Sequence, residues 1–259
     1  MASFHIRSIS LPSTSHPLTV SLEEQLYKLK ISQSSLSIAQ KLNGLKELYE
    51  CVDDVLQQTL SREKQNKSIE EALNGSLCLL DICSNTKDFF SQMRECLQGL
   101  ELSLRRSKSG VDAYMASRKT MNKLIRKYLR NFKKQDKNCK SNSDSADISV
   151  LLKDVEEISV SMFESILGFI SQPKSKSKLT IFTKNLQPKN SSCEEEVEAN
   201  EMEKMDAELL ILKSSSQTTN ILKELRTLEM SLQEAEEELE CVYRKLVKIR
   251  VSILNSLNH

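Results

Sequence analysis

The last predicted helix, about residues 220–257, has the most regular pattern of hydrophobic and polar positions in the chain. Its apolar residues recur at alternating intervals of four and three, which returns each side chain to one face of a helix. We call them the C-terminal seam: Ile221, Leu225, Leu228, Leu232, Ala235, Leu239, Val242, Leu246, Ile249 and Ile253. Charged residues fill most positions between them. Because so long an apolar stripe is unfavourable in water, we expect the rest of the chain or a second copy to cover it.

The same period recurs in earlier stretches, which polar or Ser-rich breaks separate. Ser21 and Glu24 have the spacing of a capping box and predict the start of the first helix. The next helices carry apolar faces at 38–56 and 69–104, and three more span about 111–134, 146–171 and 194–212. The pattern predicts an all-α fold, an elongated bundle of six or seven helices with a coiled-coil-like C-terminal helix.

Composition supports this fold class. The 259 residues include only five Gly and four Pro, too few for the many turns of a sheet protein. Trp is absent and aromatic residues make up 5% of the chain, so the core is expected to be largely aliphatic.

Shifts in composition divide the chain into four predicted segments. Residues 1–17 contain no acid and many Ser, which is typical of a disordered tail. Residues 18–171 form the helical bundle region. Residues 172–193 hold two Pro, five Lys and no acid, and they predict a basic flexible linker. Residues 194–259 are predicted to form a helical hairpin or a long helix that packs on the bundle.

The helix predicted at 111–134 has one apolar and one basic face, although the formal net charge of the chain is only +1. The apolar positions are Tyr114, Met121, Leu124, Ile125, Tyr128 and Phe132. The basic positions are Arg118, Lys119, Lys123, Arg126, Lys127, Arg130, Lys133 and Lys134. Pairing with the acidic segment at 194–208, or simple solvation, is the first interpretation. An acidic protein or an anionic membrane surface comes second. Nucleic acid comes last, because stacking aromatics and a recognition motif are missing.

The N-terminal tail contains a candidate phosphorylation motif. Arg7, Ser10 and Pro12 lie in the string R-S-x-S-x-P, which resembles the phosphoserine motif read by 14-3-3 proteins. A phosphate on Ser10 would add about two negative charges, which suit an arginine cluster. A 14-3-3 protein is therefore a candidate partner, although short Ser-rich tails also produce such strings by chance.

The sequence offers little that would support catalysis or metal binding. Its seven Cys include no C-x-x-C pair, and its three His lie near the termini, so we expect no metal site. Asp53 and Asp54 are adjacent carboxylates, which favours an ion pair or a solvated face over acid–base chemistry. We find no Gly-rich phosphate loop and no G-x-S-x-G. We therefore assign no catalytic or cofactor-binding residues and expect a protein that is not an enzyme.

The sequence also allows a prediction of where in the cell the protein is located. We find no secretory signal and no uninterrupted apolar run long enough for a membrane span, so we expect a cytoplasmic protein with reduced thiols. Membrane association through the basic helix is an alternative. A plastid transit peptide is less favoured, because the Ser-rich tail contains a single Arg.

Several strings, taken in order, resemble the BYPASS-like family of plants. They are R-S-I-S-L-P-S at 7–13, H-P at 16–17, L-Y-E-C-V-D-D at 48–54, L-N-G-S-L-C-L-L-D-I-C at 73–83, S-R-K at 117–119, C-E-E-E at 193–196 and Y-R-K-L-V-K-I-R-V-S-I-L-N-S-L at 243–257. The resemblance implies an all-α protein associated with root and shoot development, with no assigned reaction. It supplies no catalytic residues.

Together these observations predict a non-enzymatic helical scaffold or regulatory protein of a plant cell that acts through protein–protein contacts. A peripheral membrane protein that binds anionic lipid through the basic helix is the alternative. The partner proteins are not identified by the sequence. A homo-oligomer is also open, since a second copy would cover the C-terminal seam as well as the rest of the chain would.

Overall fold

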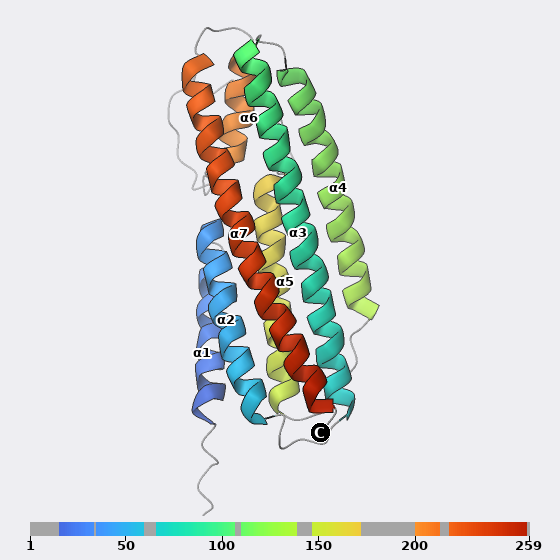
Figure 1. Ribbon diagram of the computed structural model, residues 1–259. Helices are drawn as coiled ribbons and strands as arrows, with labels where there is room; N and C mark the ends of the chain where they lie inside the picture. Colours follow the sequence, from blue (N-terminus) through green and yellow to red (C-terminus); the bar gives the residue numbers. More distant parts are fainter. Residues whose placement is uncertain are drawn as a thin grey trace, which may run out of the picture.

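Seven helices account for nearly all of the chain that the computed structural model describes, which is residues 16–33, 35–59, 66–106, 110–138, 147–171, 200–212 and 218–257. They are α1 (Pro17–Ser32), α2 (Ile38–Thr59), α3 (Asn66–Arg106), α4 (Val111–Asn138), α5 (Asp147–Ile170), α6 (Glu201–Leu212) and α7 (Thr218–Leu257). These ranges contain no strand. The helices lie side by side along one long axis (Figure 1). The predicted all-α bundle is confirmed, whereas the coiled-coil-like geometry of the last helix stays a prediction.

The two longest helices, α3 and α7, run antiparallel along the length of the bundle (Figure 1). Arg226 near the start of α7 contacts Glu101 near the end of α3, and Arg250 near the end of α7 donates to the carbonyl of Leu73. Helix α7 also packs along α2. All ten residues of the C-terminal seam are buried, none with more than 7% of its surface exposed. The chain therefore covers its own seam, and a second copy is not needed for this purpose.

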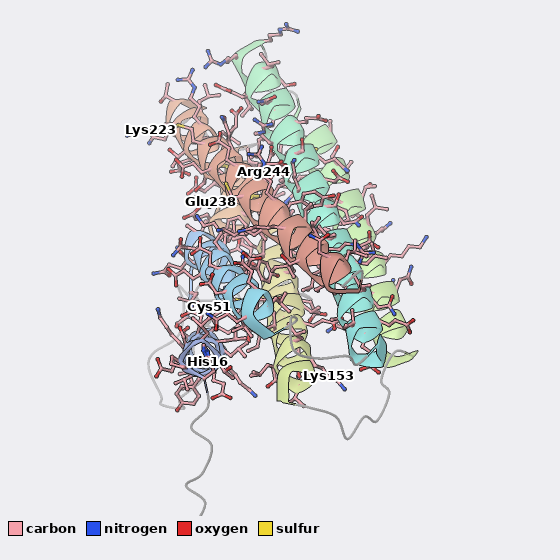
Figure 2. The ribbon with its side chains drawn as sticks, turned by 60° about the horizontal axis from the view of Figure 1, so that its bottom comes forward. His16, Cys51, Lys153, Lys223, Glu238 and Arg244 are labelled. Carbon is pink, nitrogen blue, oxygen red and sulfur yellow. The ribbon has the colours of Figure 1, made fainter. Side chains whose placement is uncertain are left out.

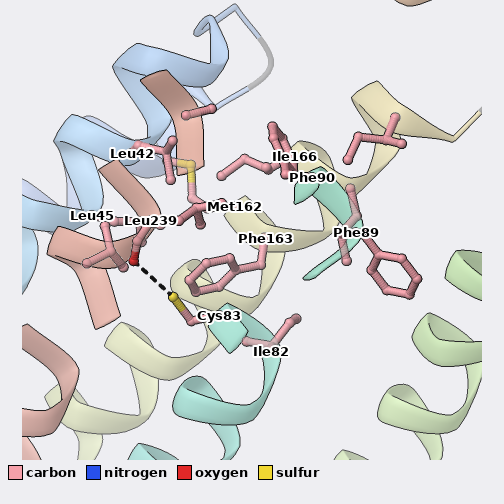
Figure 3. Packing of buried hydrophobic residues seen from close by; sticks show 14 of the residues in the cluster. Leu42, Leu45, Ile82, Cys83, Phe89, Phe90, Met162, Phe163, Ile166 and Leu239 are labelled. Atoms are coloured by element: carbon pink, nitrogen blue, oxygen red, sulfur yellow. Dashed lines mark hydrogen bonds between the residues drawn. The ribbon is translucent and has the colours of Figure 1, made fainter. Parts of the chain in front are cut away.

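The core is one continuous cluster of buried, mainly aliphatic side chains to which every helix contributes. Near its centre, Leu45 of α2, Cys83 of α3, Phe163 of α5 and Leu239 of α7 lie close together (Figure 3). The thiol of Cys83 lies 3.6 Å from the carbonyl oxygen of Leu239 and can donate to it. Each fully buried aliphatic or aromatic side chain contributes about 1.5–3 kcal/mol to folding, so the stability of the bundle comes mainly from this cluster.

The first helix starts five residues earlier than predicted. Pro17 opens α1, and the Nδ1 atom of His16 accepts a hydrogen bond from the backbone N–H of Leu18 at 3.3 Å. Proline is favoured at the first position because its ring fixes φ and it has no N–H to leave unpaired. Ser21 and Glu24 therefore lie inside the helix, and the prediction that they form its N-terminal cap was wrong. Figure 2 shows His16 at the start of α1.

Helices α1 and α2 approach each other closely at Gly44. A Cβ atom placed on Gly44 would lie 2.6 Å from Cδ2 of the buried Leu29. The chain between the two helices ends in a reciprocal cap. Ser37 Oγ accepts from the N–H of Gln40 at 3.3 Å, while Gln40 Oε1 accepts from the N–H of Ser37 at 2.9 Å. These contacts fix α1 against the outer side of α2.

Several predictions fall outside the described residues. Residues 1–15 and 172–199 contain the Ser10 motif, the predicted linker and the acids at 194–198, so the division into four segments stays a prediction. Helix α4 continues to Asn138, four residues past its predicted end. None of the helices in the described ranges combines the length and hydropathy that a membrane span requires.

Candidate interaction surface on helix α4

Helix α4 lies at one edge of the bundle, mainly against α3 (Figure 1). Its inward face holds Tyr114, Met121, Ile125 and Phe132, all of which are buried as the apolar period predicts. Of the other two predicted apolar positions, Tyr128 is partly buried, and Leu124 is an exception because 46% of its surface is exposed. One residue corresponds to 100° of rotation about the helix, so Leu124 lies well away from the direction in which Ile125 points.

The outward face of α4 is basic. Six of its side chains are exposed, and we call them the basic surface: Lys119, Lys123, Arg126, Lys127, Arg130 and Lys133. Lys133 pairs with Glu164 of α5 at 2.9 Å. Within the described ranges, Lys119, Lys123 and Lys127 pair with no carboxylate. The eighth predicted position, Lys134, has a side chain outside the described set. Among the residues that the structure describes, these three lysines therefore lie along one face of the helix without a neutralising carboxylate.

Arg118 is not part of this surface, and its assignment to it was wrong. Only 1% of its surface is exposed, because it points into the bundle and forms an ion pair with Asp206 of α6. Arg118 Nε lies 3.1 Å from Asp206 Oδ2 and 3.3 Å from Oδ1, and Nη2 lies 3.1 Å from Oδ2. The Tyr114 hydroxyl donates to Oδ1 at 3.0 Å. Burial, together with the charge of Asp206, raises the pKa of Tyr114, so this hydroxyl remains a donor at neutral pH.

Residues around this ion pair also donate hydrogen bonds to the last backbone carbonyls of α5. The last carbonyls of a helix have no donor within the helix. Arg118 Nη1 donates to the carbonyl of Ile170, and Asn200 Nδ2 donates to the carbonyl of Phe169 at 3.3 Å. Asn200 in turn caps α6, because its Oδ1 accepts from the N–H of Glu203 at 2.9 Å. Arg118, Asp206 and Asn200 therefore fasten α4, α5 and α6 together. Pairing between the basic helix and the acidic 194–208 segment does occur, at the buried Arg118–Asp206 position.

Charged residues beside the C-terminal seam also form ion pairs that join neighbouring helices. Asp53 is buried and accepts from Lys248 Nζ at 2.8 Å, from Ser252 Oγ at 3.1 Å and from Gln57 Nε2 at 2.8 Å. This geometry is that of an interhelical ion pair rather than of an acid–base catalyst. Further pairs join α7 to its two neighbours: Lys46–Glu238, Lys87–Glu240, Arg94–Glu236, Glu101–Arg226 and Glu50–Lys245.

The described cysteines are free thiols, and burial makes two of them poor nucleophiles. Burial raises the pKa of Cys83 to about 12, and it also raises the pKa of Cys96. Both thiols stay protonated at neutral pH, whereas a nucleophilic cysteine needs a thiolate. In the part of the chain that the structure describes, no three His, Cys, Asp or Glu side chains gather as metal ligands would.

The family described as Protein BPS1 matches residues 41–255, which is most of the chain. This chain belongs to the BPS1 family. The match agrees with the BYPASS-like plant family that the ordered strings resemble. It covers the basic surface, the Arg118–Asp206 ion pair and the C-terminal seam, whereas α1 lies before it. Searches of the curated proteins and of the solved structures found no match.

Proposed function

We propose that this BPS1-family protein is a non-enzymatic scaffold or regulatory protein in plant development, which works in the cytoplasm and binds an acidic partner protein through the basic surface of α4. One observation carries the proposal. Several charges beside the C-terminal seam, such as Glu236 and Lys248, pair with opposite charges on neighbouring helices, whereas Lys119, Lys123 and Lys127 have no such match among the described residues. Family membership agrees with a role in development.

The spacing of the basic surface suits an extended acidic partner. From Lys119 to Lys133 the helix rises roughly 21 Å, which is about four turns. A helix or strand with carboxylates along that length would meet a cation at nearly every turn. Charge pairs at such an exposed position mainly raise the association rate and select the partner, so binding should weaken as salt increases.

An anionic membrane is the second candidate. Leu124 is exposed beside Lys123, as an amphipathic membrane helix would require. However, Tyr114, Met121 and Ile125 are buried in the bundle and are not free to enter a lipid bilayer. Adsorption to lipid would therefore rest on charge with a single apolar anchor, and this favours the acidic protein.

The motif around Ser10 adds a separate proposal, since these residues lie outside the described ranges. We expect a phosphorylated Ser10 to recruit a 14-3-3 protein, with Arg7 and Pro12 completing the motif. A pulldown that compares phosphorylated chain with Ser10→Ala tests this directly. Equal recovery of 14-3-3 from both would end the idea.

Proximity labelling in root tissue tests the main proposal. The wild-type chain is compared with the double reversal Lys123→Glu/Lys127→Glu and with a matched control, Lys153→Glu/Lys223→Glu. The control changes the charge by the same amount at two exposed positions on α5 and α7 (Figure 2). We expect acidic proteins among those labelled by wild type and control, and their loss from the α4 variant.

Purified partner and lipid vesicles then separate the two candidates. Binding of an acidic protein, but not of phosphatidylserine vesicles, that falls with salt and with the α4 reversal supports the proposal. Binding to the vesicles alone supports the membrane alternative. The same set of labelled proteins for all three chains contradicts both.

A further inference from the structure

Helix α1 is apolar on two opposite faces. Leu22, Leu26 and Leu29 point inward and are buried. On the outer face, Tyr27 is 69% exposed and Ile31 is 64% exposed, although both are large apolar side chains, and Val20 is 37% exposed. Apolar side chains on two opposite faces are typical of a helix that is covered on both of those faces. The described part of the chain covers only the inner side.

The outer face has the spacing of a helix–helix contact. Val20, Glu24, Tyr27 and Ile31 follow at intervals of four, three and four, so they form one stripe along the helix. We call them the outer stripe. Glu23 and Lys30 lie along one side of it, and Ser21 and Lys28 along the other.

The charged residues of α1 differ from many of those on α7 because they form no ion pairs within the described chain. Glu23, Glu24, Lys28 and Lys30 are all exposed, and none of them pairs with an oppositely charged residue of the described chain. The two acids lie in the first half of the helix and the two bases in the second. Such a helix is complementary in charge to a copy of itself that runs in the opposite direction.

We propose that the outer stripe of α1 binds the outer stripe of a second copy of this chain, antiparallel and about a twofold axis. In this register Val20 packs against Ile31 of the second copy, and Tyr27 packs against Glu24. Residues that face each other have numbers that add to a constant, so each contact occurs twice, as twofold symmetry demands. Glu23 and Lys30 lie on the same side of the stripe, so each faces that side of the second copy. Their numbers add to two more than those of the stripe pairs, an axial offset of about 3 Å that these long side chains can span, and two ion pairs therefore flank the contact.

A parallel arrangement is disfavoured by the same residues. It would place Glu24 directly against Glu24 of the second copy inside the stripe, where like charges repel. The antiparallel arrangement replaces this contact with Tyr27, whose hydroxyl can donate to the Glu24 carboxylate.

The position of α1 allows this contact. It packs on α2 and α5, at the edge of the bundle opposite α4 (Figures 1 and 2). A second copy on the outer stripe would therefore leave the basic surface uncovered. One pair of short helices buries less surface than most stable dimers do, so we expect a reversible dimer of micromolar affinity.

Sedimentation equilibrium of the full chain over a range of micromolar concentrations tests the proposal. We expect wild type to pass reversibly from monomer to dimer. Ile31→Glu should weaken dimerisation by at least about tenfold, since each copy loses an apolar contact. Met230→Glu on α7 is the control, because Met230 is 63% exposed and α1 packs mainly on α2 and α5, and this variant should dimerise as wild type does. Circular dichroism checks that both variants are folded.

A charge exchange tests the register. Glu23→Lys and Lys30→Glu should each weaken self-association, because each places like charges across the axis. A mixture of the two variants should form a heterodimer, since both of its flanking contacts are then attractive. Three results overturn the proposal: a monomer at every concentration, a dimer that Ile31→Glu leaves unchanged, or a mixture that associates no better than its components.

Discussion

Arg118 and Asp206 lie 88 residues apart in the sequence and form a buried ion pair between α4 and α6. Neither side chain has appreciable contact with water, with 1% and 7% of its side-chain surface exposed. Each charge is therefore stabilised by the other and by the hydrogen bonds around the pair. Removing one partner leaves the other charge buried without compensation, which is far less favourable than the loss of a surface pair.

We expect Asp206→Ala to lower the free energy of unfolding by about 3–5 kcal/mol. Urea denaturation followed by circular dichroism measures this change. Lys119→Ala, which removes an exposed charge one residue after Arg118, should change stability by less than about 0.5 kcal/mol. The double variant Arg118→Met/Asp206→Leu should recover most of the loss, because apolar side chains tolerate burial. A loss below about 1 kcal/mol in Asp206→Ala would show that the pair is not a structural clamp.

The C-terminal seam yields a second prediction. Leu239 is completely buried at the centre of α7, so Leu239→Ala should lower the free energy of unfolding by about 2–5 kcal/mol through lost burial and a new cavity. Met230→Ala on the same helix should change it by less than about 0.5 kcal/mol, because Met230 is mostly exposed. Chemical denaturation compares the two. Similar effects at both positions would mean that the seam is not the buried face.

Replacement of Gly110 and of Gly99 by alanine should change the stability of the protein in opposite directions. Gly110, between α3 and α4, has φ of 126°, and a Cβ there would lie 2.5 Å from Cβ of Ser103. Gly110→Ala should therefore lower stability by about 1–3 kcal/mol. Gly99 lies within α3 with nothing within 4 Å of an added Cβ, so Gly99→Ala should raise stability by about 0.5–1 kcal/mol. Thermal denaturation would contradict this reasoning if both melting temperatures moved in the same direction.

Acid should weaken the contact between α3 and α7 at Glu101. Its carboxylate accepts from Arg105 at 2.7 Å and from Arg226 at 2.9 Å, and these hydrogen bonds lower the pKa of Glu101 below its ordinary value of 4.5. A lowered pKa stabilises the fold above the pKa of the unfolded chain, and this stability is lost as the pH falls through the folded value. Glu101→Gln should destabilise the protein at neutral pH by less than about 1 kcal/mol, since Arg226 is largely exposed.

Denaturation midpoints between neutral pH and about pH 3 check this prediction. The difference between wild type and Glu101→Gln should shrink below about pH 4.5. A difference that grows on acidification would reverse the assigned sign. Glu229→Gln is a useful control, because its carboxylate lies on the same interface without an arginine partner among the ion pairs found in the described helices.

The bundle was predictable because the period of a helix does not depend on what covers it. The alternation of four and three from Ile221 to Ile253 named every buried position of that face of α7 before any partner was known. The same reasoning contained an unused signal at Arg118. It lies four residues after Tyr114 and three before Met121, which is an inward position, and Asp206 has the same relation to Met202 and Leu209. Judging Arg118 by its charge rather than by its position in the period produced the error.

Other features depend on information that a local pattern lacks. That Asp206 is the partner of Arg118 follows from the way in which α6 packs beside α4, and no spacing within either helix encodes it. The start of α1 was misplaced because the Ser21–Glu24 spacing matches a capping box, whereas histidine is not among the residues that usually cap a helix. The partner of the basic surface could not be predicted from a local pattern either, because its identity depends on a second molecule.

The antiparallel arrangement of α3 and α7 has a consequence for biosynthesis. The ribosome completes α2 and α3 well before α7, and at usual rates of translation the interval is on the order of ten seconds. During that time α7 is not yet present to cover the apolar residues that pack against it in the folded protein. The nascent chain is therefore a natural client for chaperones, and a premature stop codon anywhere before α7 should yield an aggregating product instead of a smaller folded one.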